Sequence, residues 1–365
     1  MEKYLKVILT VIVVVQISSC SKFLDKDPLD QISSNTFWTN QKEVDMALAG
    51  VYARILSSTF NHNTMFWDVL GGDICANQGS DAVALGQGLI EATSGGIVSG
   101  IYSQCYQGIS SCNFFLENVD RAPVTDEIKN RYKGEVLFMR ALFYFTLTEF
   151  YGGVPMYTNL VTIDESKVKQ STKEEVVAQI LKDLDIAINS LPNTGYNGHA
   201  VKGSALGLKA KVLLHNGKWG EAAEAAKQII TDGKFSLFGD YRSLFLASGQ
   251  TNNPEIMMSA RYLNPDRPSN GPDIQFAWHG TINPREELVD DDECVDGKTI
   301  SQSPLYQPAN WRLNRDPRLL MTIKAFEDSV VNSKGVTMGF NYNAQSGTGF
   351  EPVKGLNCDA LPVEY

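Results

Sequence analysis

The feature that most constrains the fold is the stretch Glu135–Pro155, which reads EVLFMRALFYFTLTEFYGGVP. Over Val136–Tyr151, apolar residues occur on every side of a helical wheel, so other helices must enclose this one. The sixteen residues Val136–Tyr151 are short for a membrane span and include two charged residues, Arg140 and Glu149. A Gly-Gly pair and a proline then end the helix. The sequence therefore predicts a central helix inside a helical protein.

Composition and motifs exclude several classes of function. The 365 residues have a formal net charge of −10, which argues against nucleic acid, because phosphate binding needs a basic surface. No GxSxG, HExxH, P-loop or dinucleotide fingerprint occurs, so we do not expect an enzyme. A carboxylate pair for glycoside hydrolysis is defined by a distance in space, which a sequence does not reveal.

Metals, cofactors and disulfides are not expected either. The six cysteines and four histidines show no zinc spacing, and no cofactor motif is present. The acidic run Asp290–Glu293 supplies oxygen ligands of the kind calcium prefers, but it lacks the alternation and the glycine of an EF-hand loop. Cys105 and Cys112 are seven residues apart on one helix face and are predicted to be small core residues.

The N-terminus reads as a targeting segment. Lysines precede the apolar run Val7–Val15, and Ile17-Ser18-Ser19-Cys20 resembles a bacterial lipobox. We expect residues 1–19 to be a lipoprotein signal peptide, Cys20 to be acylated, and residues 20–40 to form a tether. Several acyl chains anchor a protein stably in a membrane. The alternative is an ordinary secretory signal with an incidental cysteine.

Hydrophobic periodicity predicts a set of helices. They are expected at Lys42–Ser57, Tyr102–Val119, Asp126–Tyr151, Thr172–Leu191, Gly203–His215 and Trp219–Asp232. Thr172 and Glu175 form a capping box, and Thr39 or Asn40 can cap the first helix. The run GKWGEAAEAAKQII has the spacing of a tetratricopeptide helix, which predicts antiparallel helix pairs. A short helix within Phe60–Leu70 and a strand within Glu255–Tyr262 are also expected.

The long loop Asn61–Gly100 supplies the first candidates for ligand binding. Loops of this length are often functional, and aromatic faces beside amide and carboxylate groups bind sugars. The candidates are Trp67, Asp68, Asp73, Asn77, Gln78 and Asp81. Tyr262 and Trp278, near polar loops of the C-terminal third, are further candidates. The alternative is that Trp67 belongs to the core and that the polar residues are solvated.

Three motifs together resemble the SusD/RagB family of outer-membrane nutrient-binding lipoproteins: RALFYFTLTEFYGGVP, FLDKDPLDQISSNTFW and NRDPR. The resemblance implies a mainly α SusD-like fold over residues 41–365. Residues 41–232 would form a helical part with tetratricopeptide-like pairs, and residues 233–365 a loop-rich, partial C-terminal part with an irregular ligand-binding surface. The family's final helix pattern is absent, which predicts exposed apolar surface and lower stability.

The same resemblance implies a function. A surface lipoprotein of the outer membrane would capture a glycan and deliver it to a SusC-like TonB-dependent transporter, without breaking a bond. Two alternatives stay open at this point. The ligand could be a peptide, as in RagB-like members, or the chain could be a periplasmic tetratricopeptide scaffold without a nutrient ligand.

Two arginines are expected to act structurally. Arg140 lies among apolar residues of the central helix, so its guanidinium must be paired, and Glu117 and Glu149 are the candidate partners. In the NRDPR motif, Asp316 is expected to pair with Arg315 or with Arg318.

Overall fold

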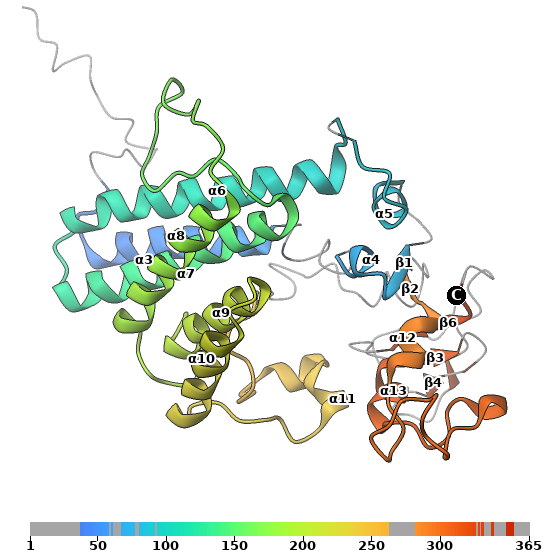
Figure 1. The fold of residues 1–365 in the computed structure, drawn as a ribbon. Coiled ribbons are helices and arrows are strands. Elements are labelled where there is room, and N and C mark those ends of the chain that lie inside the picture. The colour runs from blue at the N-terminus through green and yellow to red at the C-terminus, as the bar shows by residue number, and fades with distance from the viewer. Residues whose placement is uncertain are drawn as a thin grey trace, which may run out of the picture.

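The part of the chain that the computed structural model describes consists of residues 37–57, 60, 67–76, 80–91, 93–262, 282–325, 328, 330–331, 337–338 and 348–353. In this part the protein is mainly α-helical, as predicted (Figure 1). The predicted signal peptide and lipidation site Cys20 lie outside the described residues, as does most of the predicted tether.

The longer helices form the body of the molecule. They are α3 (Gln41–Tyr52), α6 (Gly96–Asn118), α7 (Asp126–Tyr151), α8 (Lys173–Ser190), α9 (Lys202–His215) and α10 (Trp219–Asp232). Each predicted helix is confirmed, and α7 has the predicted bounds. From α6 to α10, each helix packs against the next one in the chain, which produces the expected tetratricopeptide-like pairs (Figure 1).

Side-chain caps define where these helices begin. The Asn40 side chain accepts a hydrogen bond of 3.1 Å from the Glu43 N–H at the start of α3. At α8, Thr172 and Glu175 form the predicted capping box. The helix α7 ends directly before Gly152, whose backbone has φ +70°. Residues other than glycine rarely adopt this conformation.

The helix α7 is enclosed, as its sequence requires. The side chains of Met139, Phe143 and Tyr144 are fully buried in the main core. Gly108 allows α6 to approach closely, since a Cβ at this position would lie 2.5 Å from Phe143 Cε2. Cys105 and Cys112 are buried in the same core, as predicted.

The prediction of the Arg140 partner was wrong. Arg140 forms a bidentate ion pair with Asp183 of α8, with Nε 2.7 Å from Oδ2 and Nη2 2.8 Å from Oδ1. Glu117 instead accepts a hydrogen bond from the Leu160 N–H, and Glu149 pairs with His215 and with Lys173 of α8. The reason is packing: Asp183 is 1% exposed on the α8 face that contacts α7.

The segment after α7 is clamped to the helices by buried polar side chains. Arg140 Nη1 donates to the Thr158 carbonyl at 2.9 Å, and the Asn113 amide donates to the carbonyls of Tyr157 and Asn159 at 3.0 Å. The Tyr144 hydroxyl bonds to both the N–H and the carbonyl of Tyr157. The following loop is exposed, with 86% of Ile163 accessible.

The remaining described elements are short. The helices are α4 (Asp68–Gly71), α5 (Ser80–Gly86), α11 (Tyr241–Leu244), α12 (Glu286–Asp291) and α13 (Pro317–Thr322), and the 3₁₀ segments include Ala53–Leu56. The strands are β1 (Ile74–Ala76), β2 (Ile282–Pro284), β3 (Ile323–Ala325), β4 (Val330–Val331), β5 (Thr337–Met338) and β6 (Phe350–Pro352). They form three antiparallel pairs: β1 with β2, β3 with β6, and β4 with β5.

Two local predictions have different outcomes. Of the helix expected over Phe60–Leu70, residues 61–66 lie outside the described part of the chain, and α4 begins at Asp68 and ends at Gly71. The strand expected within Glu255–Tyr262 was wrong. Its backbone bonds to side chains instead of to a neighbouring strand: Tyr196 bonds to both backbone groups of Ser259, and the Ser204 hydroxyl donates to the Met257 carbonyl.

The NRDPR motif is structural, as expected. Asp316 caps α13 and pairs with Arg318, with Nη2 2.6 Å from Oδ2. These hydrogen bonds lower the pKa of Asp316 to about 2. Arg315 is buried and donates to the backbone carbonyls of Asp292, at 2.8 Å, and Val289. The motif therefore joins α12 and α13.

Candidate binding site

Strand pairing builds an irregular surface from two distant parts of the chain. Ile74 pairs with Pro284 and Ala76 with Ile282, and the Arg285 N–H donates to the Asp73 carbonyl at 2.9 Å. Gly72, at φ +87°, ends α4 and turns the chain into β1. The predicted loop region therefore lies beside the C-terminal part of the chain (Figure 1).

The candidate aromatic residue of this region packs inward. Trp67 is half-buried, and its ring meets the rings of Phe150 at 5.0 Å and Phe60 at 6.3 Å, both edge to face. Its Nε1 is buried without a hydrogen-bond partner among the described residues. The contacts are those of a core residue, and a ligand-binding role for Trp67 stays a prediction.

The candidate carboxylates are exposed on adjacent elements. Asp68 begins α4, Asp73 precedes β1, and Asp81 lies in the first turn of α5. Because α4, β1 and α5 contact one another, the three carboxylates occupy one region. Asp81 also lies against the start of α6, where a Cβ on Gly96 would be 1.4 Å from its Oδ2.

The other candidates are placed differently. Asn77, Gln78 and Trp278 lie outside the described residues. Tyr262 is half-buried and belongs to the segment that follows Arg261; burial raises the pKa of its hydroxyl. Within the described part of the chain, that hydroxyl is buried without a hydrogen-bond partner.

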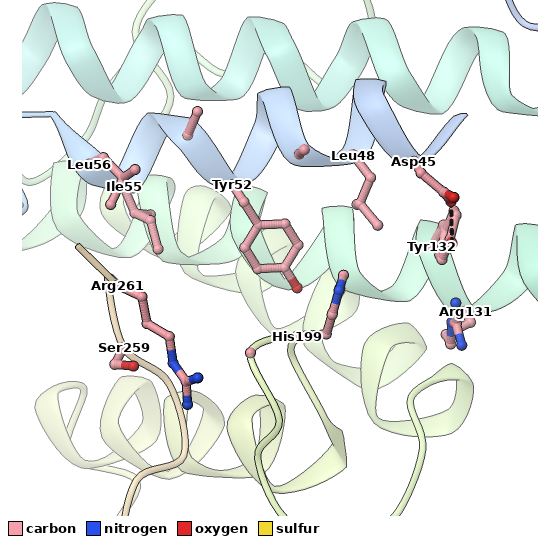
Figure 2. A pocket seen from close by; sticks show the side chains of 13 residues that line it. Asp45, Leu48, Tyr52, Ile55, Leu56, Arg131, Tyr132, His199, Ser259 and Arg261 are labelled. Carbon is pink, nitrogen blue, oxygen red and sulfur yellow. Dashed lines mark hydrogen bonds between the residues drawn. The ribbon is translucent and has the colours of Figure 1, made fainter. Parts of the chain in front are cut away.

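A pocket that the sequence did not indicate opens between α3, α7 and two turns. Its volume is about 580 Å³. Tyr52, Leu48 and the 3₁₀ segment contribute its apolar floor, and Arg131, His199 and Arg261 contribute polar groups (Figure 2). The pocket combines an aromatic ring with several hydrogen-bond donors, which is the composition of a small-molecule site.

A buried carboxylate organises one wall of this pocket. Glu135 is 1% exposed, and its Oε2 accepts a hydrogen bond of 2.7 Å from the Tyr52 hydroxyl and lies 2.8 Å from His199 Nδ1. The Tyr52 oxygen in turn accepts from the Ala200 N–H at 2.7 Å. Burial and the neighbouring charge of Glu135 raise the pKa of Tyr52.

The signal for this network was a carboxylate inside α7, directly before its most apolar stretch. Because Glu135 directly precedes the enclosed stretch, its side chain is expected to be buried. A buried carboxylate needs hydrogen-bond partners. Its partners could not be read from the sequence, because Tyr52 and His199 are far away along the chain.

Neither a metal cluster nor a membrane-spanning helix occurs among the described residues. In the described ranges, no three His, Cys, Asp or Glu side chains lie close enough together to hold a metal ion. Among the same residues, no helix has the length and apolar character needed to cross a membrane.

Comparison with known proteins identifies relatives along most of the chain. A SusD-like protein of Formosa agariphila is 25% identical over 278 residues, which cover 70% of this chain and 51% of the relative. A SusD-like protein of Bacteroides ovatus is 25% identical over 264 residues, or 67% of this chain and 47% of the relative. The chain thus spans about half the length of these curated relatives.

Solved structures share the fold. A SusD-like protein of Bacteroides fragilis superposes with a TM-score of 0.75 at 23% identity, covering 93% of this chain and 73% of that structure. A laminarin-binding SusD-like protein superposes with a TM-score of 0.63 at 22% identity, covering 87% and 73%.

A family model matches more than half of the chain. The match runs over residues 22–214 and includes α3, α6, α7, α8 and most of α9. The chain therefore belongs to the SusD-like family, which is described as starch-binding and associating with the outer membrane.

Proposed function

We propose that this protein is a lipid-anchored, surface-exposed lipoprotein of the outer membrane that captures an oligosaccharide and delivers it to a SusC-like TonB-dependent transporter. It breaks no bond, and its work consists of binding and transfer. The observation that carries the proposal is the β1–β2 pairing. This pairing places the 68–81 region, with its exposed carboxylates, beside the C-terminal part of the chain. The family of the chain is described as starch-binding.

The exposed aspartates of the 68–81 region are suited to binding a glycan. Carboxylates accept hydrogen bonds from sugar hydroxyls. The three exposed aspartates lie on short elements with little core beneath them, as is common for binding loops supported by a rigid scaffold. In this proposal Trp67, Asn77, Gln78, Tyr262 and Trp278 stay candidate contacts.

Calorimetry against two ligand panels tests the ligand class. We expect a glycan panel containing starch and laminarin oligosaccharides to show binding, and a panel of random peptides to show none. Binding to peptides alone would overturn the proposal. The variant Asp73→Ala should weaken glycan binding, whereas Asp185→Ala, an exposed aspartate on α8, serves as the matched control.

Labelling and digestion test the anchor and its location. Palmitate labelling should be lost in Cys20→Ala and kept in the control Cys75→Ala. External protease should degrade the protein in intact cells, and resistance would favour a periplasmic location. Co-purification of a TonB-dependent β-barrel with the wild-type protein tests the partner.

A further inference from the structure

We propose that the pocket between α3, α7 and residues 259–261 binds an anionic sugar unit, one that carries a carboxylate or a sulfate. The inference rests on the proposed function, since it names the kind of glycan that the protein takes. None of its lining residues belongs to the strand-paired surface. Most of them come from α3, the 3₁₀ segment after it and α7 (Figure 2).

Two guanidinium groups line the pocket, Arg261 without an ion pair among the described residues and Arg131 with a long one to Glu135. Arg261 is exposed and stacks on the Tyr196 ring at 5.2 Å, and it makes no ion pair with any described residue. Arg131 stacks on the Tyr132 ring at 4.8 Å, and its Nε lies 3.7 Å from Glu135 Oε1, too far for a hydrogen bond. Both retain N–H donors in the fork geometry that matches carboxylate and sulfate oxygens.

The carboxylates near the pocket are already engaged. Asp45 Oδ1 accepts a hydrogen bond of 2.5 Å from the Tyr132 hydroxyl. Glu135 accepts from Tyr52 and faces His199. One oxygen of each carboxylate is therefore engaged inside the protein, and the guanidinium groups of Arg131 and Arg261 supply the cationic donors that an anion would need. In the view of Figure 2, Arg261 and Arg131 lie on opposite sides of Tyr52 and His199.

The shape and lining of the pocket favour a sugar over an extended peptide. The Tyr52 ring can pack on sugar C–H groups, and the Ser259 hydroxyl can bond to sugar hydroxyls. Ala49 and Gly198 leave space above the floor, and about 580 Å³ lies within the usual range of ligand pockets. The segment that carries Ser259 is not a strand, so it offers no edge for a peptide.

Calorimetry with three tetrasaccharides tests the inference. The probes are tetragalacturonate, which carries carboxylates, a carrageenan-type tetrasaccharide, which carries sulfates, and neutral laminaritetraose. We expect one of the two anionic probes to bind, and its identity names the anionic group. Because Arg261 would donate charge-assisted hydrogen bonds, Arg261→Gln should weaken that binding about ten- to hundredfold and leave laminaritetraose unchanged.

Two further variants separate charge from shape. Ala49→Phe fills the pocket from an exposed position of α3 without a change in charge, and it should abolish binding of the anionic probe. Lys227→Gln removes one positive charge from a 72%-exposed position on α10 and should have no effect. Circular dichroism confirms that each variant is folded.

The outcomes distinguish this inference from the proposed function. Unchanged anion binding in Arg261→Gln or in Ala49→Phe would overturn the assignment of the pocket. An equal loss in Lys227→Gln would also overturn it, because the effect would then be one of net charge. Binding of laminaritetraose alone overturns the anionic site and supports the proposed function. Binding of none of the three probes overturns the anionic site, and the proposed function fails as well if the starch and laminarin panel also shows no binding.

Discussion

The helical body and the strand-paired part of this protein are stabilised in different ways. In the helical body, each helix from α6 to α10 packs on its neighbour in sequence, and α6 to α9 share one continuous core. In the strand-paired part, formed by α4, β1, α5 and β2, the partner of β1 follows more than two hundred residues later. Among the described residues, its buried cluster consists of Val69, Ile74 and Ile282, with Ala76 and Ile97 packed against it.

This difference bears on where the proposed binding surface lies. A region with few buried apolar contacts opens locally at lower free energy than a continuous core, and binding loops are commonly of that kind. The helical body supplies rigidity, and the strand-paired part supplies a surface that can vary. Single substitutions test this contrast directly.

The largest effect is expected at the buried ion pair of the helical body. Asp183→Ala leaves the Arg140 guanidinium buried and unpaired, which should lower the free energy of unfolding by about 3–5 kcal/mol. The control is Asp185→Ala on the same helix, whose 57%-exposed side chain pairs with Lys209. It should cost about 0–1 kcal/mol. Urea denaturation measures both, and equal losses would contradict the structural role of Asp183.

The next effect concerns the contact between α6 and α7. Gly108→Ala places a Cβ against the Phe143 ring and should destabilise the protein by about 1–3 kcal/mol through overpacking. Gly100→Ala on the same helix meets no atom within 4 Å and should stabilise it slightly, because alanine favours helices. Thermal unfolding should therefore show shifts of opposite sign, and shifts of the same sign would refute the close approach.

A smaller effect is expected in the strand-paired part. Ile282→Ala removes one of three buried side chains and should cost about 1–2 kcal/mol, within the common range for single substitutions. Hydrogen exchange should accelerate in β1 and remain slow in α7. Acceleration throughout α7 would show that the two parts unfold as one unit.

The smallest effect is expected at Asp316. Its folded pKa of about 2 lies below the usual value near 4, so its contribution is complete above pH 4 and disappears as the pH falls toward 2. The stability difference between the wild type and Asp316→Asn should shrink over the same interval. The effect is small because the partner, Arg318, is mostly exposed. A constant difference from pH 5 to pH 2 would exclude this ion pair.

The sequence predicted those features that depend on neighbouring residues. The bounds of α7, the caps at Asn40 and Thr172, and the stop at Gly152 all follow from local chemistry. Partners across the fold could not be predicted in the same way. Acidic residues on two helices were candidate partners of Arg140, but its partner in the structure, Asp183, lies on a third helix.

The candidate sites show the same limit. An exposed carboxylate such as Asp81 is visible in a sequence, but the strand that joins its region to Ile282 is not. The pocket around Tyr52 combines four separate segments, none of which carries a motif of its own. Its only sequence signal was the buried Glu135, whose partners required coordinates.

The polar clamp after α7 has a consequence for tolerance to insertion. Tyr157 is held by Tyr144 at one end of the exposed loop, and the Ser171 N–H donates to the Val154 carbonyl at 3.1 Å at the other. With both ends fixed, lengthening the loop changes mainly its closure entropy, about 0.6 kcal/mol for each doubling of length. An epitope tag beside Ile163 would therefore leave the helices intact and report, in living cells, which side of the membrane the protein faces.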